Sequence, residues 1–455
     1  MPLMRLIAEN IGPFERLDID FSDGHGKPHR GPHILAGVNG SGKSTVLRAI
    51  AWALSWDGYG FPEEEWKHFL RGPKSRALIH LAPEHSSPYI VSVTADSNDN
   101  WGEPQRLAAS LGLDDLGEFE AYDRWQAFGK GATARRHPFT MCAYAPSRSI
   151  SHVAARAAMH PLKRPTDYCL AFEAAVQNNA IQGWLVELFS KEALAKGRGQ
   201  EFVSYAQSIA LFQDALKLVC DDPTISVGVE LEPNLEPRVN FRGNSLNFSQ
   251  LSDGVRTTMG WLADFMMRQD QMGSSNGAGR TREGLLLLDE IDIYLHPRWQ
   301  RTLLPAMRTA LPDVQIIASS HSPFVISSCP DARIHVLTLD EGGAAHACPP
   351  QAAPFGESVT ATLRDIFGVE SRFDVQTEGD LKEWDTLKRE EAVGKLTPAK
   401  RKRLEALADG LSERSEELRL IVKSPSALQA SLLNKMVSPT AKRNGNRASG
   451  TAKRR

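Results

Sequence analysis

Apolar and polar residues alternate in three short runs near the start of the chain. The runs are 4–11 (MRLIAENI), 15–21 (ERLDIDF) and 33–38 (HILAGV), separated by a Gly-Pro pair and by a polar loop. Alternation of period two is typical of a β-strand with one buried face. Residues 44–54 (STVLRAIAWAL) then carry apolar side chains at helical spacing. The pattern predicts a strand, a glycine-rich loop and a helix in that order.

Strand and helix patterns alternate again in the second half of the chain. LSDGV, residues 251–255, opens a predicted helix that continues to Arg268. The runs 285–290 (LLLLDE) and 314–320 (VQIIASS) are short and apolar, as buried strands are, and a helix is predicted from Pro297 between them. This alternation favours a parallel α/β sheet.

Two other regions have helical character. Residues 166–218 carry helical spacing without an internal proline, and the chain beyond about residue 356 is mostly charged helix. We therefore expect an α/β protein that has a mixed sheet, an antiparallel β subdomain, a helical insertion and a helical C-terminal region. The predicted segments are 1–165 for the N-terminal lobe, 166–220 for the insertion, 221–345 for the C-terminal lobe, 346–425 for the charged helices and 426–455 for a basic tail without regular structure.

Composition narrows the class of protein. The 455 residues include 53 Lys and Arg against 55 Asp and Glu, so attraction to nucleic acid would need a local basic patch. The five cysteines form no CxxC pair, which argues against a zinc site and a disulfide framework. The first 15 residues do not resemble a signal peptide, and no apolar run is long enough to span a bilayer. We expect a soluble cytoplasmic protein without membrane contact.

The loop GVNGSGKS, residues 37–44, matches the phosphate-binding pattern G-x-x-x-x-G-K-S/T. Glycines let the backbone curl around phosphate oxygens, and the N–H groups of the following helix face the anion. Lys43 is predicted to bridge the β and γ phosphates of ATP, Ser44 to hold Mg²⁺, and Thr45 to reach the α phosphate. The predicted nucleotide-binding residues of this loop are Gly37, Asn39, Gly40, Ser41, Gly42, Lys43, Ser44 and Thr45.

Two later strand ends supply the remaining chemistry. LLLLDE ends in two carboxylates, of which Asp289 is predicted to orient Mg²⁺ and Glu290 to accept a proton from the attacking water. His321 follows the strand 314–320, so we expect it at the sheet edge that carries the glycine loop, where an imidazole can sense the γ phosphate. Acids at a strand end can also be merely solvated, and a lone histidine in a turn is often incidental.

The motifs of this chain are, in chain order, LIAENIGPFERLDIDF, GVNGSGKS, LSDG, LLLLDE and SSHS. The order of the motifs resembles that of the ATP-binding-cassette (ABC) class of P-loop ATPases. The resemblance covers roughly residues 1 to 340 and is to the SMC, RecF and OLD-like branch. Within it, the compact core and DEIDIYLHP are similar to stand-alone bacterial ATPases of phage-defence operons, including those of Septu, PARIS and retron systems. The resemblance implies a mixed P-loop NTPase sheet that binds ATP and Mg²⁺.

The family's signature segment caps the γ phosphate of a partner subunit's nucleotide. Ser252 and Gly254 match its serine and second glycine, whereas Asp253 and Val255 replace its first glycine and its glutamine. His296 stands where the family has a D-loop aspartate. The Q-loop glutamine has no firm match, with Gln126 and Arg148 as the two alternatives.

The resemblance implies an ATPase that dimerises on ATP and drives a separately encoded effector such as a nuclease, with DNA as a further candidate partner. A RecF-like DNA-repair clamp is the first alternative and a transporter subunit the second. An intrinsic OLD-type nuclease is disfavoured, because QTEGDLKEW, which contains Glu378, lacks the preceding apolar strand and a following DxD.

Overall fold

The computed structural model divides into two compact units, Met1–Thr362 and Leu363–Arg455. It describes residues 2–55, 68–82, 89–95, 120–123, 139–146, 169–172, 178–199, 203–230, 235–275, 283–369, 371 and 373–423. Gln126, Arg148 and the predicted basic tail lie outside the described residues. No described helix is long and apolar enough to cross a membrane.

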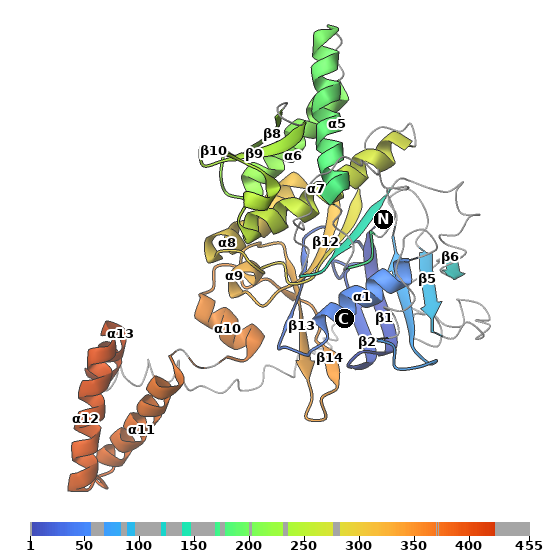
Figure 1. The fold of residues 1–455 in the computed structure, drawn as a ribbon. Helices are drawn as coiled ribbons and strands as arrows, with labels where there is room; N and C mark the ends of the chain where they lie inside the picture. Colours follow the sequence, from blue (N-terminus) through green and yellow to red (C-terminus); the bar gives the residue numbers. More distant parts are fainter. Residues whose placement is uncertain are drawn as a thin grey trace, which may run out of the picture. The chain divides into compact units, whose positions relative to one another are not determined.

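A largely parallel sheet forms the centre of the first unit (Figure 1). Its strands, in spatial order, are β14 (Ala345–Ala347), β13 (Arg333–Leu339), β3 (His33–Gly37), β12 (Val314–Ser319), β11 (Gly284–Leu288) and β7 (Thr140–Tyr144), and β15 (Gln351–Ala352) also pairs with β13. The strands β3, β7, β11 and β12 are buried at every position. A strand covered on both faces needs continuous apolar sequence, which explains the LLLL run of β11.

A second sheet is built from the N-terminal strands. It runs β2 (Phe14–Asp20), β1 (Leu3–Ile11), β4 (Arg76–Leu81), β5 (Tyr89–Thr94) and β6 (Glu120–Asp123), and all neighbours except β5 and β6 are antiparallel. The buried amide of Gln315 joins the two sheets: it accepts from the backbone N–H of Leu3 at 2.7 Å and donates to the Leu3 carbonyl at 2.9 Å. Helix α1 (Lys43–Leu54) contacts strands of both sheets.

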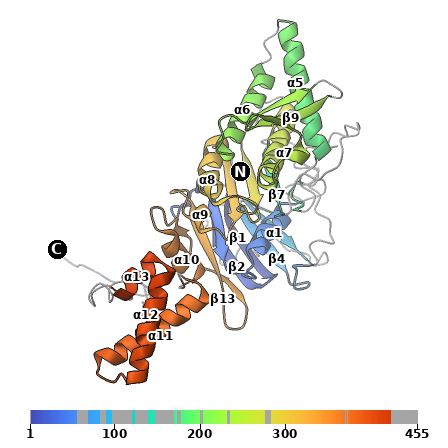
Figure 2. The ribbon, with the colours of Figure 1, turned by 60° about the vertical axis from the view of Figure 1, so that its left-hand side comes forward.

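Helices and a small sheet complete this unit. They are α5 (Asn178–Gly197), α6 (Val203–Val219), the 3-10 turn η2 (Phe248–Gln250), α7 (Asp253–Ser275), α8 (Pro297–Ala310), α9 (Pro323–Ile326) and the strands β8 (Ser226–Glu230), β9 (Glu236–Phe241) and β10 (Asn244–Leu246). Figures 1 and 2 show α5 and α6 extending away from the two large sheets. The mixed α/β fold that the sequence predicted is thus confirmed, with helices where the insertion was expected.

A buried ion pair within α7 is hydrogen-bonded to β7. Arg268 donates to Asp264 at 2.8 Å one turn away, and both side chains are fully buried. The hydroxyl of Tyr144 donates to the same carboxylate at 2.8 Å. Burial and the neighbouring Asp264 raise the pKa of Tyr144, which therefore stays a neutral donor. This polar network was not foreseen from the apolar spacing of the helix.

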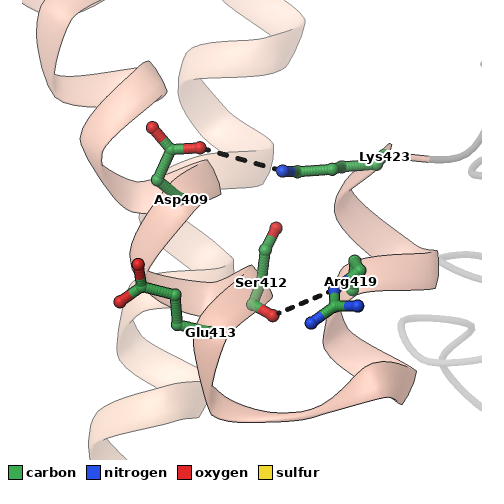
Figure 3. A pocket seen from close by; sticks show the side chains of 5 residues that line it. All are labelled: Asp409, Ser412, Glu413, Arg419 and Lys423. Carbon is green, nitrogen blue, oxygen red and sulfur yellow. Dashed lines mark hydrogen bonds and ion pairs between the residues drawn. The ribbon is translucent and has the colours of Figure 1, made fainter.

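The second unit is a small helical bundle. Helix α10 (Val359–Phe367) spans the division between the units, and α11 (Val375–Ala392), α12 (Pro398–Arg414) and α13 (Glu416–Lys423) follow. Nine buried side chains, with Trp384 among them, form its own hydrophobic core. In Figure 3 a shallow groove separates α12 from α13, and Lys423 and Arg419 face Asp409 and the Ser412 carbonyl across it at 3.9 Å and 3.4 Å.

Two sequence features have a local structural explanation here. Glu378, the acid of QTEGD, accepts from the backbone N–H of Phe373 at 3.1 Å, and Asp374 caps the start of α11 by accepting from the N–H groups of Gln376 and Thr377. Residues 351 and 352 pair with β13, and the first unit extends to Thr362. The predicted domain boundaries stay predictions.

Two neutral histidines are buried between β3 and β13. The imidazoles of His33 and His335 lie 3.0 Å apart, nitrogen to nitrogen, and Phe21 packs edge-on against His33. Burial lowers the pKa of His33 well below its ordinary value and lowers that of His335 to about 3. The folded protein therefore binds fewer protons than the unfolded chain at mildly acidic pH.

We expect this pair to make the first unit acid-sensitive. The contribution of the pair to the free energy of unfolding is fully present above about pH 6.5, the pKa of an unfolded histidine. Below this pH, protonation of the unfolded chain lowers the free energy of unfolding by about 1.4 kcal/mol per pH unit for each histidine. Replacing His33 and His335 together by leucine should flatten the fall in melting temperature between pH 6.5 and 4.5. The exposed His25, changed to Asn, is the control; an unchanged pH slope in the double variant would contradict the assignment.

Candidate functional site

Three parallel strands end at the same edge of the central sheet. Leu288 of β11 pairs with Ala318 of β12, and Ser319 pairs with Leu35 of β3. The residues that follow each strand therefore share this edge: the glycine loop after β3, the carboxylates after β11 and His321 after β12. Such an edge, where parallel strands end at their carboxyl termini, is the usual ligand site of α/β sheets.

The glycine loop has a backbone that other residues would strain. Gly37, Gly40 and Gly42 have φ angles of 150°, 81° and 90°. A Cβ atom on Gly37 would lie 2.3 Å from the Leu337 carbonyl, and one on Gly42 would lie 2.4 Å from the ring of Phe14. The sequence pattern is therefore required by the geometry of the loop as well as by any ligand.

Lys43 is the first residue of α1 and its side chain turns back into the loop. Its ammonium group donates to the carbonyls of Gly37 at 3.0 Å and Val38 at 2.9 Å. Burial lowers the pKa of Lys43, and the charges of Asp289 and Glu290 oppose that shift. The ammonium group of Lys43 is thus held within the glycine loop, close enough to the carboxylates after β11 to interact with their charges.

The two carboxylates belong to a tight turn, residues 289–295. Asp289 is buried, and its backbone N–H donates to the carbonyl of Tyr144 at 2.9 Å. Glu290 has a φ of 46°, the left-handed region that a residue with a side chain enters only when its surroundings impose it. The hydroxyl of Ser319 contacts both residues: it donates to Asp289 Oδ1 at 2.6 Å and accepts from the Glu290 N–H at 2.7 Å.

His321 begins the turn after β12 and is partly buried. Its backbone N–H donates to Asp292 Oδ1 at 3.3 Å. Burial and the positive charge of Lys43 lower the pKa of its imidazole, against the opposite influence of Asp292, Glu290 and Asp289. The lowered pKa favours the neutral imidazole at pH 7, which offers a hydrogen-bond donor and acceptor rather than a charge.

The signature residues lie at the start of α7. Ser252 is exposed just before the helix, whereas Gly254 is buried. A Cβ atom on Gly254 would lie 2.6 Å from the carbonyl of Tyr294. Gly254 therefore has a packing role within its own chain, against the turn that carries Glu290, whatever Ser252 contacts.

Several residues of the site were missed by the sequence analysis. Ser319 and Tyr144 bond to the carboxylate turn. Ser319 ends a predicted strand and begins SSHS but received no role, and Tyr144 was not singled out. Asp292 was visible as the third acid of DEID but received no role. His296, which stands in the D-loop position, caps α8 by accepting from the Arg298 N–H at 3.2 Å.

The residues present fit a nucleotide with a divalent cation. The buried hydroxyl of Ser41 has no hydrogen-bond partner within the loop, so the cradle holds a donor that a phosphate oxygen would satisfy. The loop adds the Lys43 ammonium and the start of a helix, which both attract anions. Ser44 and Asp289 supply the oxygen ligands that Mg²⁺ prefers.

Comparison with known proteins gives the same picture. A retron protein of Vibrio cholerae serotype O1 biovar El Tor, "Retron Vc95 probable ATPase", is 28% identical and covers 72% of this chain and 73% of the relative. "Retron Ec83 probable ATPase" of Escherichia coli is 24% identical over 72% of this chain and 70% of its own length. "Septu protein PtuA" of Bacillus mycoides is 30% identical over a shorter region, 28% of this chain and 17% of the relative.

Solved structures of SMC heads are also matched. The SmcHead bound to the C-winged helix domain of ScpA covers 78% of this chain and 98% of its own, at 14% identity and a TM-score of 0.43. A family model described as "AAA domain, putative AbiEii toxin, Type IV TA system" matches residues 33–327, which include the glycine loop, the carboxylate turn and His321. The chain therefore belongs to this AAA-domain family of P-loop ATPases.

Proposed function

We propose that the protein binds ATP with Mg²⁺ and hydrolyses it. The observation that carries this proposal is the convergence of Lys43, Glu290 and His321 on one sheet edge, each after a different buried parallel strand. The register of β3, β11 and β12, which aligns the ends of these three strands, supports the proposal. The retron relatives, whose names describe them as probable ATPases, support the same activity.

Each residue has a distinct task in this proposal. Lys43 neutralises charge on the β and γ phosphates, and Ser44 and Asp289 hold the cation. Mg²⁺, when bound, withdraws electron density from the phosphates and offsets their negative charge. Glu290 accepts the proton of the attacking water, and the neutral His321 donates a hydrogen bond toward the γ phosphate. The phosphate-contacting backbone comes from residues 37–45.

The proposal includes a dimer that closes on ATP. The glycine loop and the carboxylate turn each expose one large apolar side chain, Val38 at 47% and Tyr294 at 57%. Ser252 is exposed at the start of α7, a helix that Gly254 holds against the same turn. A second copy that covers this surface would place Ser252 against the partner's nucleotide, as the resemblance to the ABC class implies.

We place the ATPase in bacterial phage defence, coupled to a separately encoded effector such as a nuclease. The support is similarity to retron and Septu proteins, of which the two retron relatives match over most of their length. These relatives do not favour the alternative of a RecF-like repair clamp. DNA stays a candidate partner, and steep salt dependence of DNA-stimulated hydrolysis would reveal it.

Two substitutions test the hydrolysis site. Lys43→Ala should abolish tight ATP binding, because the loop loses the positive charge of the lysine ammonium group. Glu290→Gln should bind ATP normally yet lower the steady-state rate by about 10²-fold to 10⁴-fold, because the water loses its base. Phosphate release and binding of a fluorescent ATP analogue measure the two effects. Hydrolysis at the wild-type rate in either folded variant would refute the site assignment.

A mixing experiment tests the composite dimer. Ser252→Arg should bind ATP but neither dimerise nor hydrolyse it, and Lys43→Ala should be inactive for lack of nucleotide. A heterodimer of the two carries both defects in one composite site and none in the other. Mixing should therefore restore part of the hydrolysis, or at least ATP-dependent dimerisation measured by light scattering.

The control is each variant mixed with itself at the same total concentration. If neither signal returns although both proteins are folded, Ser252 does not act on a partner's nucleotide.

A further inference from the structure

Ser319, at the end of β12, and His321, just after it, form hydrogen bonds to four consecutive residues of the carboxylate turn. The Ser319 hydroxyl contacts Asp289 and Glu290, and the Ser319 carbonyl accepts from the Ile291 N–H at 2.9 Å. Two residues later, the His321 N–H donates to Asp292 Oδ1. The strand that leads to His321 is therefore also the template on which the turn is formed.

The Ser319 hydroxyl has a double role within this set of bonds. Its one proton is donated to Asp289 Oδ1 at 2.6 Å, and a lone pair accepts the Glu290 N–H at 2.7 Å. Ser319 is fully buried, so water has no access to replace the hydroxyl. A hydroxyl satisfies both partners at once because it is a donor and an acceptor, which neither a methyl group nor a carbonyl can be.

The two bonds act on different properties of the site. The bond to Asp289 fixes the orientation of a carboxylate that would hold the cation, and such outer partners tune the affinity of a metal site. The bond from Glu290 holds a backbone whose φ of 46° is unfavourable for a residue with a side chain. The same oxygen thus orients the Asp289 side chain and holds the backbone from which the Glu290 side chain extends.

We propose that Ser319 is a positioning residue that aligns Asp289 for the divalent cation and Glu290 for the attacking water. This inference rests on the proposed ATPase function and gives a role to the first serine of SSHS, which the sequence analysis left without one. Ser319 touches neither nucleotide nor cation in this role. It acts through the carboxylate of Asp289 and the backbone of Glu290.

The test compares two buried serines with the same bonding pattern. Ser75 is also fully buried; its hydroxyl accepts from the Arg71 N–H at 2.9 Å and donates to the Asn10 carbonyl at 2.7 Å. Ser319→Ala and Ser75→Ala therefore remove equivalent pairs of hydrogen bonds. Both full-length variants would be measured for melting temperature, for binding of a fluorescent ATP analogue in EDTA, and for binding of Mn²⁺ with ATP by electron paramagnetic resonance.

We expect Ser319→Ala to bind the metal-free nucleotide within about twofold of wild type, because the glycine loop is untouched. Its Kd for Mn²⁺ should rise by about 10-fold to 100-fold, the usual effect of removing an outer partner of a metal ligand, and kcat should fall at least as much. Ser75→Ala should change the melting temperature comparably but leave both quantities near wild type. Ser319→Thr, which keeps the hydroxyl, should recover Mn²⁺ binding.

The inference would be overturned if Ser319→Ala and Ser75→Ala had the same Kd for Mn²⁺ and the same kcat. It would also be overturned if Ser319→Thr bound Mn²⁺ as weakly as Ser319→Ala although its melting temperature equals that of wild type. Failure of the proposed function is a separate result: wild-type protein would then not hydrolyse ATP, or Glu290→Gln would not slow it. If Ser319→Ala does not fold, Ser319→Thr and Ser319→Cys, which weakens the donor and keeps the shape, carry the same comparison.

Discussion

The parallel register of β3, β12 and β11 is the constraint on which the rest of this molecule depends. The pairs Leu288 with Ala318 and Ser319 with Leu35 align three strand ends. A shift of one residue would move a strand end by about 3.3 Å relative to its neighbour and so separate the residues that follow the strands. The glycine loop, the carboxylate turn and His321 then need only short connections to reach one another.

Several polar side chains lie close together at this edge of the central sheet, whose strands are otherwise apolar. Lys43, Asp289, Ser319 and His321 are all at least partly buried, and each has a hydrogen bond from its side chain or backbone to another part of the edge. Buried polar groups are costly unless they are paired. The site is therefore ordered by its internal bonds, with Ser41 left as an unsatisfied group where a phosphate would bind.

Helix α7 is also connected to the residues at this sheet edge. Tyr144 links it to the site directly, because its hydroxyl contacts Asp264 and its carbonyl accepts from the Asp289 N–H. Gly254, at the other end of the exposed signature segment, permits close approach of the Tyr294 carbonyl. A displacement of the signature segment would therefore also displace the turn that carries Glu290.

The sequence by itself determined the local chemistry. Apolar runs ending in glycines or acids identified the strands and the residues after them, because burial and phosphate binding each demand particular residue types at fixed spacing. It could not show that Ser319 bonds to Asp289 and Glu290, or that Arg268 pairs with Asp264 beside Tyr144. Nor could it show that Glu378 accepts a hydrogen bond from the backbone of Phe373, just before α11. Those contacts are decided by strand register and helix docking, which only tertiary packing of distant segments provides.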